Sequence, residues 1–532
     1  MSFRLSVVRA AGVVWLASCG LEAPPPAAVS SEATADAAHR HARVLRVGSW
    51  HGKRGPFPTI QAAVNAASPD DWILIGEGDF RETGDPASGV LITTPRLHLR
   101  GMDRNRTIVD GTQVVGGEAR PCNPAPEAQV VTTQGRNGIQ VFKVDGVSIE
   151  NLTVCNYLSN ERGAIEAGNQ IWWNGGDGSG QIGLGTYHGA YLTASTTFST
   201  PEATARYGVF TSNSRGPGVF EHLYASNMSD SSFYVGACPD CNATLRHVHA
   251  QNSAQGFSGT NAGGHLVLED SEWDQNRVGI ASTTLADDDP PSPQNGACPD
   301  HPGRSCTLIR RNHVHDNNRA TTPGAGIAGS VPVGTGILIS GGRNDTLRDN
   351  LITHNGAWGV MLNDYPDFAA TTCNGGTPGF NPPAPFDLLL GPIVPCYFHS
   401  FGTEVSDNLL AGNGFFGNAT NGDLANAALP SSAANCFRHN RKLGRGGITS
   451  APVAIEDPAV LGSCGAAWAG DTDQEMQLFA ELLCDTFGPA SGACAPTEPG
   501  YPVPGTVTLL PIPHEPGMRN PCEGVPENPW CD

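Results

Sequence analysis

A short pattern of polar and apolar positions recurs along the middle of the chain, from about residue 138 to residue 413. Each copy starts with Asn, His or Ser, continues through a short run that contains apolar residues, and ends with Asn five places later. A second pattern follows a few residues downstream, in which Gly opens a short alternating segment. The first pattern spans residues 151–156 (NLTVCN), 222–227 (HLYASN), 247–252 (HVHAQN), 271–276 (SEWDQN), 312–317 (NHVHDN), 350–355 (NLITHN) and 408–413 (NLLAGN), and the second begins at Gly208, Gly256, Gly279, Gly336 and Gly359.

The spacing of these copies predicts the architecture. Copies of the first pattern begin at His222, His247 and Ser271, so the unit repeats after roughly two dozen positions, and Gly256 and Gly279 follow the same period. A repeated unit of this length can bury its apolar face only by stacking on its neighbours. It holds two or three strands of roughly five residues and leaves no room for a helix. We therefore expect each repeat to be one coil of a parallel β-solenoid, with Asn in left-handed bends and identical Asn residues stacked into a ladder.

With these repeats, residues from about 44 to 440 resemble the right-handed parallel β-helix repeat family, the pectate-lyase-like superfamily that includes pectate lyases, polygalacturonases and alginate epimerases. The resemblance implies an all-β fold, a right-handed parallel β-helix, with an active groove on the sheet that the Gly-led segments build. It implies no particular reaction, because this fold hosts several chemistries.

The chain departs from the motifs of the characterised members of this family. It has no paired-Asp signature resembling that of polygalacturonases, no Asp-Pro-His motif, no Arg- and Lys-rich surface like that of pectate lyases, and no glycine-aspartate calcium nonapeptide. The similarity is therefore to uncharacterised secreted bacterial β-helix proteins.

Alternation along the Gly-led segments separates inward side chains from outward ones. We expect the coil to be filled by Val209, Phe233, Phe257, Ile280, Ile337 and Val360. The outward side chains would then form two columns: Phe210, Tyr234, Ser258, Ala281, Leu338 and Met361, and Ser212, Gly236, Thr260, Thr283, Ser340 and Asn363. These columns lack the two close carboxylates that a glycosidase needs.

The N-terminus has the pattern of an export signal. Arg4 and Arg9 precede a short apolar core, and residues 16–19 (LASC) resemble a bacterial lipobox. This resemblance implies a signal peptide over residues 1–19 and a lipid anchor on Cys19, the alternative being an ordinary cleaved signal with an incidental Cys. Residues 20–43 predict a flexible tether, and we expect membrane contact through the lipid alone.

Helices are predicted near both ends of the β-helix, which we place at residues 44–450. Apolar residues at i, i+3, i+4 and i+7 behind a Thr59 N-cap predict a capping helix over 59–67, followed by a strand at 72–75. A second amphipathic helix is expected from about residue 471 to 487, on one face of which lie Met476, Phe479, Leu482 and Leu483. The region 451–532 would thus be a C-terminal cap followed by a Pro-rich tail stapled by disulfides.

Composition narrows the possible partners. Charged residues make up only 15% of the 532 residues, and Gly and Pro number 66 and 42, as expected of short strands and turns. A formal net charge of −20 with only three Lys argues against nucleic acid, and it disfavours a polyanionic glycan unless a cation bridges the two. We expect a monomer.

Cysteine usage supports export. Of 15 Cys, 14 remain once Cys19 is set aside, an even number for an oxidising compartment. Among the pairings that the sequence allows, we expect the local ones: Cys238–Cys241, Cys298–Cys306 and Cys373–Cys396.

Candidate binding residues gather where the repeat lapses, between about residues 157 and 204. Flat rings beside amide and carboxylate groups suit a sugar-binding platform, and a Tyr beside a His could serve as base and acid in β-elimination. The alternative is a cluster of rings that packs over the coil. The candidate binding residues are Trp172, Trp173, Asn174, Asp177 and Tyr191, with Tyr234 and Asn363 from the outward columns, and the candidate catalytic pair is Tyr187 and His188.

Acidic loops offer further chemistry. Asp287, Asp288 and Asp289 could hold Ca²⁺ through hard oxygen ligands, and Asp287 with Asp364 could supply an acid/base pair. The alternative for the triplet is a solvated acidic loop before proline.

Two HxH pairs, His247/His249 and His313/His315, have a spacing that can bind metals. Alternation puts both members of each pair on one face of a strand, and the same positions hold Asn, Leu and Thr in other coils. We therefore interpret them as repeat positions rather than ligands.

Together these features predict an exported, lipid-anchored β-helix protein that engages carbohydrate, with lyase or hydrolase activity as an option. The rival hypothesis is a non-catalytic surface or adhesion scaffold. The two differ in whether Tyr187, His188, Asp287 and Asp364 converge on one pocket.

Overall fold

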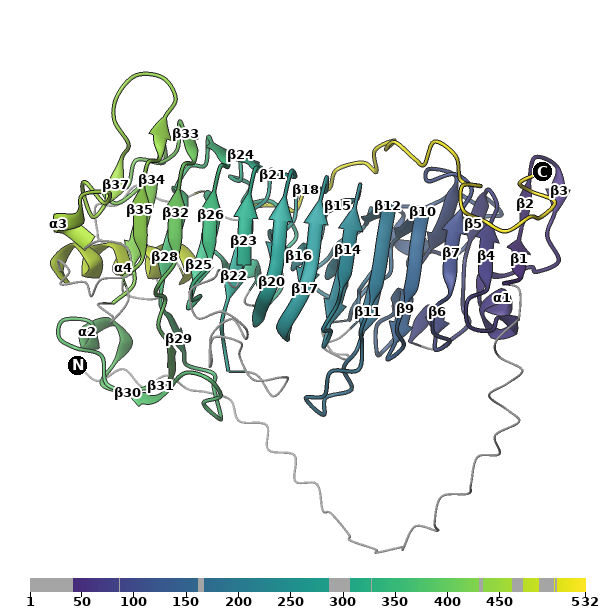
Figure 1. Ribbon diagram of the computed structural model, residues 1–532, viewed down its shortest axis with the longest axis horizontal. Coiled ribbons are helices and arrows are strands. Elements are labelled where there is room, and N and C mark those ends of the chain that lie inside the picture. Colours follow the sequence, from purple (N-terminus) through teal and green to yellow (C-terminus); the bar gives the residue numbers. More distant parts are fainter. Residues whose placement is uncertain are drawn as a thin grey trace, which may run out of the picture. The chain divides into compact units, whose positions relative to one another are not determined.

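The chain winds into a right-handed parallel β-helix whose regular coils each contribute three strands (Figure 1). One such coil consists of Cys238–Arg246 (β17), His249–Gln251 (β18) and Gln255–Ser258 (β19). Each strand pairs in parallel with its counterpart on the next coil, and the pairing of Phe257 with Ile280 matches the repeat period of the sequence. The predicted fold class is confirmed.

The computed structural model describes residues 42–85, 87–160, 167–286, 307–326, 328–429, 434–461, 472–487, 502 and 505–532. Several predictions fall outside these residues: the signal peptide with Cys19, most of the tether, the triplet Asp287, Asp288 and Asp289, and the pair Cys298 and Cys306.

A 21-stranded parallel sheet forms two of the three faces of the coil, because its strands lie in two rows that share β10 and β12. The first row consists of β1 (Val44–Val47), β4 (Trp72–Ile75), β7 (His98–Gly101), β10 (Val147–Cys155), β12 (Tyr187–Ser195), β14 (Gly218–Glu221), β17, β20 (Ala262–Glu269), β23 (Thr307–Arg310), β26 (Thr346–Arg348), β32 (Glu404–Ser406) and β35 (Cys436–Arg438). The second row adds β5 (Gly78–Phe80), β8 (Thr107–Asp110), β15 (Tyr224–Ser226), β18, β21 (Glu272–Asp274), β24 (His313–His315), β27 (Leu351–Thr353), β33 (Leu409–Ala411) and β36 (Arg441–Lys442).

An 11-stranded parallel sheet forms the third face and is built by the Gly-led segments. It consists of β6 (Ser88–Ile92), β9 (Asn137–Phe142), β11 (Ile171–Asn174), β13 (Tyr207–Ser212), β16 (Ser231–Val235), β19, β22 (Val278–Thr283), β25 (Thr335–Ser340), β28 (Trp358–Asn363), β34 (Gly422–Ala427) and β37 (Ser450–Ala451). Small antiparallel sheets lie beside the coils, made of β2 (Ser49–Trp50) with β3 (Lys53–Arg54), and of β29 (Tyr365–Asp367), β30 (Thr377–Phe380) and β31 (Val394–Phe398).

The interior of the coil contains the side chains that alternation assigned to it. Val209 pairs in register with Phe233, Phe233 with Phe257, and the column continues through Ile280 to Val360, all with no exposed surface. Burying an aliphatic or aromatic side chain contributes about 1.5–3 kcal/mol relative to leaving it in water, so each coil is stable only against its neighbours.

Asn ladders run inside the bends of the later coils, as predicted. The amide of Asn312 donates to Asn350 at 3.1 Å, that of Asn350 to Asn408 at 2.9 Å, and that of Asn408 to Asn440 at 2.9 Å. A second ladder five residues on joins Asn276, Asn317, Asn355 and Asn413, each link 3.1 Å long. These amides satisfy each other and the neighbouring backbone where water is excluded.

The left-handed residue of each bend differs between the two halves of the β-helix. In the earlier coils it is the Asn or His itself, as at Asn151 (φ 58°) and Asn227 (φ 69°). In the later coils it is the residue before the Asn, as at Asp349 (φ 57°) before Asn350. The expectation that Asn occupies the left-handed position is therefore wrong for the later coils. There the preceding residue makes the bend, and the Asn side chain is buried in the ladder.

Helices lie near both ends, where the sequence predicted them. Helix α1 (Ile60–Ala66) begins behind Thr59, whose hydroxyl accepts from the Ala62 amide at 3.2 Å, and α1 packs against β1, β4 and β6. Helix α4 (Thr472–Phe487) packs against β34 and β37, with Phe479 and Leu482 buried against the outward Met361. It therefore covers the outer face of the last coils. Two further short helices are α2 (Asp387–Leu390) and α3 (Pro458–Leu461).

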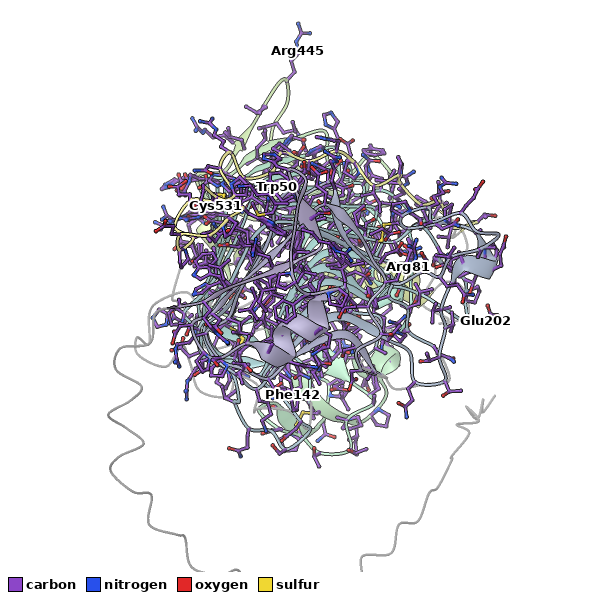
Figure 2. All side chains as sticks on the ribbon, turned by 90° about the vertical axis from the view of Figure 1, so that its right-hand side faces the viewer. Trp50, Arg81, Phe142, Glu202, Arg445 and Cys531 are labelled. Atoms are coloured by element: carbon purple, nitrogen blue, oxygen red, sulfur yellow. A yellow bond between two sulfur atoms is a disulfide. The ribbon has the colours of Figure 1, made fainter. Side chains whose placement is uncertain are left out.

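The C-terminal tail returns along the outside of the coils toward the first strands (yellow in Figure 1). Trp530 lies there in an apolar cluster with Leu74 and Met102, which also includes Trp50 and Cys531, both labelled in the end-on view of Figure 2. The Trp530 indole donates to the Lys53 carbonyl oxygen at 2.9 Å. The described part of the tail is irregular and follows the coils for much of their length.

Four disulfides have both of their cysteines among the described residues. Two are the local pairs that we expected, Cys238–Cys241 and Cys373–Cys396. The others, Cys122–Cys155 and Cys522–Cys531, join a loop to β10 and close the end of the tail.

Candidate aromatic binding pocket

The outward column of the 11-stranded sheet contains three consecutive aromatic residues. Trp172 on β11 pairs in register with Phe210 on β13, and Phe210 pairs with Tyr234 on β16. The column then continues through Ser258 and Ala281, as alternation predicted. Its aromatic part is confined to three successive coils, which lie about 4.8 Å apart because that is the distance between paired strands.

These rings form the wall of a pocket. Trp172 stacks on Phe210 with 5.2 Å between ring centroids and 5° between planes, and Tyr234 meets Phe210 edge-on at 4.7 Å. The ring centroids of Tyr207 and Phe210 lie 4.6 Å apart. The pocket has a volume of about 140 Å³. Such offset and edge-on pairs hold aromatic rings rigidly, so the pocket is formed before any ligand arrives.

Polar groups lie between the rings. The Trp172 indole donates to the Ser212 hydroxyl at 3.0 Å, and that hydroxyl donates to Asn174 Oδ1 at 3.3 Å. Asn213 and Thr260 also line the pocket. None of the twelve described residues that line it is a carboxylate, a histidine or a cation. The pocket therefore offers stacking surfaces and neutral hydrogen-bonding groups without a strong acid or base.

A carboxyl group lies behind the pocket wall rather than in it. The Tyr207 hydroxyl donates to Asp230 Oδ2 at 3.0 Å. Burial, followed by the charge of Asp230, raises the pKa of Tyr207 well above its usual value, and burial raises the pKa of Asp230 to about 6. This hydrogen bond fixes the position of the Tyr207 ring in the pocket wall.

The later part of the same outward face is covered. Leu338, Met361 and Ala425 lie beneath helices α2 and α4 and strand β31 in one apolar cluster. The aromatic coils are thus the part of this face where a cavity opens.

Three predicted binding residues line the pocket: Trp172, Asn174 and Tyr234. Asp177 lies between the pocket residues Gly176 and Gly178 and is paired with Lys143, and hydrogen bonds from Lys143 and Ser179 lower the pKa of Asp177 to about 2.

Two predicted site residues fill the core instead. Trp173 has no exposed surface, and Tyr187 is 3% exposed and packs against Trp173 and Phe220. Gly218, the register partner of Tyr187 on the next coil, leaves room for the ring, because a Cβ there would lie 2.0 Å from it. Burial raises the pKa of Tyr187 to about 12. A buried phenol inside the coil cannot reach a polysaccharide, so the structure argues against Tyr187 as a catalytic base.

His188 and Tyr191 face outward on a different sheet. His188 lies between Glu150 and Glu221, with nitrogen–oxygen distances of 3.3 and 3.4 Å. Burial lowers the pKa of His188, but the two carboxylates outweigh burial and raise this pKa above its usual value. Tyr191 stacks on His222 at 4.7 Å.

Asp364 anchors local structure. It has no exposed surface and accepts hydrogen bonds from the Tyr397 hydroxyl at 3.0 Å and from the amides of Ser400 and Leu429 at 2.6 and 3.1 Å. Its neighbour Asn363 donates to Ser340 at 2.8 Å, several coils away from Tyr234 along the same sheet. Tyr187, His188 and Asp364 therefore do not converge on one pocket.

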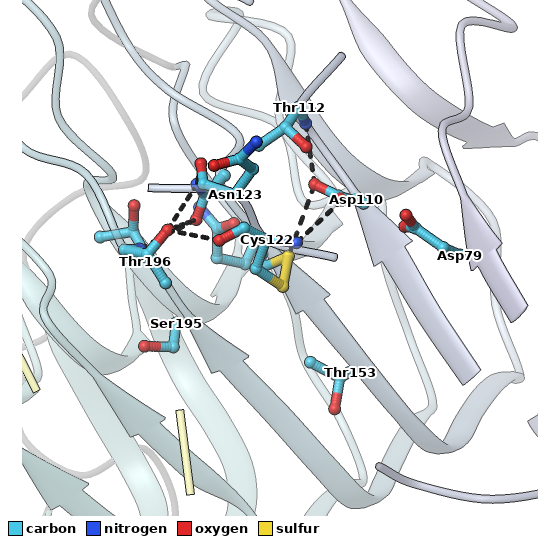
Figure 3. Close-up of a disulfide and its surroundings, with 12 residues drawn as sticks. Asp79, Asp110, Thr112, Cys122, Asn123, Thr153, Ser195 and Thr196 are labelled. Carbon is cyan, nitrogen blue, oxygen red and sulfur yellow. Dashed lines mark hydrogen bonds between the residues drawn. A yellow bond between two sulfur atoms is a disulfide. The ribbon is translucent and has the colours of Figure 1, made fainter. Parts of the chain in front are cut away.

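A pair of carboxyl groups, of which Asp110 is buried, was not among the site residues predicted from the sequence. Asp79 in the middle of β5 and Asp110 at the end of β8 lie near the Cys122–Cys155 disulfide, Asp110 being the nearer of the two (Figure 3). Arg81 pairs with both, and burial followed by the charge of Asp110 raises the pKa of Asp79. Asp110 also accepts from the amides of Thr112 and Cys122, which makes it a structural clamp for the loop after β8.

A larger cleft, of about 610 Å³, lies between this loop and the tail. Its walls include Ile108, residues 120–122, Pro124 and residues 509–514, which are rich in proline and aliphatic groups, together with Asn105, Thr153 and Thr197. It has no aromatic platform among these residues, so the pocket at Trp172 is the better candidate for a sugar.

Comparisons with known proteins place the chain by fold only. No protein-family profile and no curated protein matches the sequence. Among solved structures, the Azotobacter vinelandii mannuronan C-5 epimerase AlgE4 A-module is similar, with 12% identity, a TM-score of 0.40, and coverage of 72% of this chain and 90% of that one. An alginate lyase from Paenibacillus sp. has 11% identity, a TM-score of 0.35, and coverage of 77% and 98%. Pectate lyase Pel9A has 10% identity, a TM-score of 0.32, and coverage of 80% and 86%.

These similarities are too distant to transfer a reaction or a site. None of the helices among the described residues has the length and the apolar composition that crossing a bilayer requires.

Proposed function

We propose that this protein is an exported carbohydrate-binding β-helix protein, and that it holds a neutral glycan in the pocket of Trp172, Phe210 and Tyr234. The observation that carries the proposal is the row of rings on three successive coils with neutral polar groups between them. Binding sites for small uncharged ligands combine apolar and aromatic walls with a few placed polar groups.

The charge of the molecule supports a neutral ligand. The chain carries a formal net charge of −20, and none of the residues lining the pocket is cationic. A polyuronate would meet repulsion without a compensating Arg or Lys. The lack of an acid or base among the lining residues likewise favours binding over bond cleavage.

Export and anchoring complete the proposal. Disulfides persist in oxidising compartments, and four are described here. The lipobox-like sequence supports acylation of Cys19. Full-length protein expressed in a bacterial host should partition into the detergent phase of Triton X-114, and a Cys19→Ala variant should not. Equal partitioning would contradict the anchor without touching the pocket.

The test of binding is calorimetric titration with neutral polysaccharides (xylan, galactan, β-glucan) and with alginate and pectate as acidic counterparts. We expect at least one neutral polymer to bind and the acidic ones not to. Phe210→Ala and Tyr234→Ala should each weaken binding by roughly 10- to 30-fold, because truncating a central aromatic costs on the order of 2 kcal/mol.

Two variants serve as controls. Phe415→Ala removes a ring that is 57% exposed outside the pocket, and Tyr191→Ala removes an outward ring on the other sheet. Both should bind as the wild type does. If none of the neutral polymers binds, the carbohydrate proposal fails and the scaffold hypothesis takes its place.

A further inference from the structure

The outward face of β21 and β24 carries three side chains that could share one metal ion. His313 and His315 lie on the same face of β24, since Val314 between them is buried in the core. Glu272 on β21 is the register partner of His313. One nitrogen of each imidazole and one Glu272 oxygen lie within 4.8 Å of one another.

Surrounding contacts orient these groups. His315 Nδ1 lies 2.9 Å from Asp316 Oδ2, which leaves Nε2 directed toward Glu272 Oε1 at 3.1 Å. The ring of His313 stacks on that of His315 with 3.8 Å between centroids. A carboxylate behind a ligating imidazole fixes its tautomer and raises its basicity, as is usual around bound metals. The strands themselves are held by the buried Trp273 and Val314.

We propose that Glu272, His313 and His315 bind a divalent transition-metal ion of the zinc class. Two imidazoles and one carboxylate suit Zn²⁺, Co²⁺, Ni²⁺ or Cu²⁺, whereas Ca²⁺ takes oxygen ligands almost exclusively. Three protein ligands leave at least one coordination position for water or an oxygen of a bound molecule.

The sequence alone favoured reading these histidines as repeat positions, and the placement of Glu272 beside His313 on the paired strand changes that interpretation. On the next coil, the register partners of His313 and His315 are Leu351 and Thr353, so strand stacking at these positions does not require imidazole. An ion pair would need only His315 and Glu272. The additional imidazole of His313 at the same place is a feature that a metal site requires and an ion pair does not.

Neighbouring groups are committed elsewhere. Asp274 accepts from Gln251 and Gln275 at 2.9 and 3.0 Å and lies 2.8 Å from His249 Nε2. The group formed by Asp110, Cys122 and Cys155 has metal-binding residue types, but its sulfurs are joined in a disulfide. The proposed site lies on the 21-stranded sheet and is independent of the aromatic pocket on the 11-stranded sheet.

Untagged protein stripped with EDTA and dialysed is the material for the test. Titration calorimetry should show one equivalent of Zn²⁺ bound and no competition by Ca²⁺. Bound Co²⁺ should show the visible absorption bands that are typical of a low coordination number. His313→Gln and Glu272→Gln should each weaken Zn²⁺ binding by 10-fold or more, and Asp316→Asn by about 10-fold.

His249→Gln is the matched control, because it alters an outward histidine on the adjacent coil outside the proposed ligand set. It should leave Zn²⁺ affinity unchanged. Circular dichroism and Tm in EDTA should be the same for all variants, which separates loss of ligands from loss of fold. Absence of stoichiometric binding by the wild type, or wild-type affinity in His313→Gln, would overturn the proposal.

Discussion

Asn227 and Leu510 are 283 residues apart in the chain and exchange two hydrogen bonds, one from Asn227 Nδ2 to the Leu510 carbonyl oxygen and one from the Leu510 amide to Asn227 Oδ1, both 2.9 Å long. A single side chain thus pairs with the backbone of the tail as a neighbouring strand would. Asn105 makes the same double contact with Glu515, at 2.9 Å in each direction. The tail is bound to the coils through the amides of bend residues.

Replacing Asn227 by Gly should loosen this part of the tail. Gly keeps the left-handed backbone (φ 69°) while removing both contacts, each worth about 1 kcal/mol. Hydrogen exchange at the Leu510 amide should become faster by 10-fold or more. Asn242→Gly, at another left-handed position (φ 42°), controls for the backbone change. Unaltered exchange at Leu510 would show that the tail is held by its other contacts alone.

Breaking an Asn ladder should destabilise the whole β-helix. Asn350 has no exposed surface, and its amide links Asn312 to Asn408 while donating to the Ile309 carbonyl oxygen at 3.0 Å. Asn350→Ala leaves several buried groups without partners, at about 1–3 kcal/mol for each. We expect urea unfolding to show a loss of roughly 3–5 kcal/mol. Asn65→Ala, exposed on α1, should change stability by less than about 0.5 kcal/mol.

A buried carboxyl group should make stability fall as pH rises. Burial raises the pKa of Asp345 from 3.8 to about 7, so its protonated form is favoured in the folded state. Its stabilising contribution is complete below the unfolded pKa of about 3.9 and is lost as pH rises through 7. Between pH 5 and pH 8 the stability of Asp345→Asn should therefore rise relative to that of the wild type, by at most about 3 kcal/mol. Urea unfolding of both proteins at pH 5 and at pH 8 measures how the difference between their free energies of unfolding changes with pH. A difference that is the same at both pH values would refute the prediction.

Disulfides of different span should contribute unequally. Cys122–Cys155 closes 33 residues and Cys238–Cys241 only three. Because loop-closure entropy grows with span, removing the first pair by double Ser substitution should cost about 2–4 kcal/mol and removing the second should cost less. Thermal unfolding without reductant measures both. A larger drop in Tm for the short loop would contradict the entropic argument.

The aromatic pocket could be predicted from the sequence only in part. Alternation and period were enough to place Phe210 and Tyr234 in one outward column, because strand geometry permits only two directions. The burial of Tyr187 could not be predicted from the sequence, because its strand begins in a segment without the repeat. Its inward direction follows from register with Val147 and Gly218 on the adjoining coils.

Contacts between segments that are distant in the chain could not be predicted from the sequence either. Glu272 and His313 are farther apart in the chain than one regular repeat, so only the paired strands reveal that they are neighbours. The same holds for the burial of Asp364 beneath Tyr397 and Leu429.

The sequence by itself determined the coil, because a short, regular period with alternating apolar positions can bury its apolar side chains in one way, by stacking. It also determined which residues fill the interior of the Gly-led sheet and that Asn would form ladders. The tertiary structure alone decided which outward surfaces stay open. That choice depends on where α2, α4, β31 and the returning tail pack, and these contacts join residues whose separation in the chain follows no period.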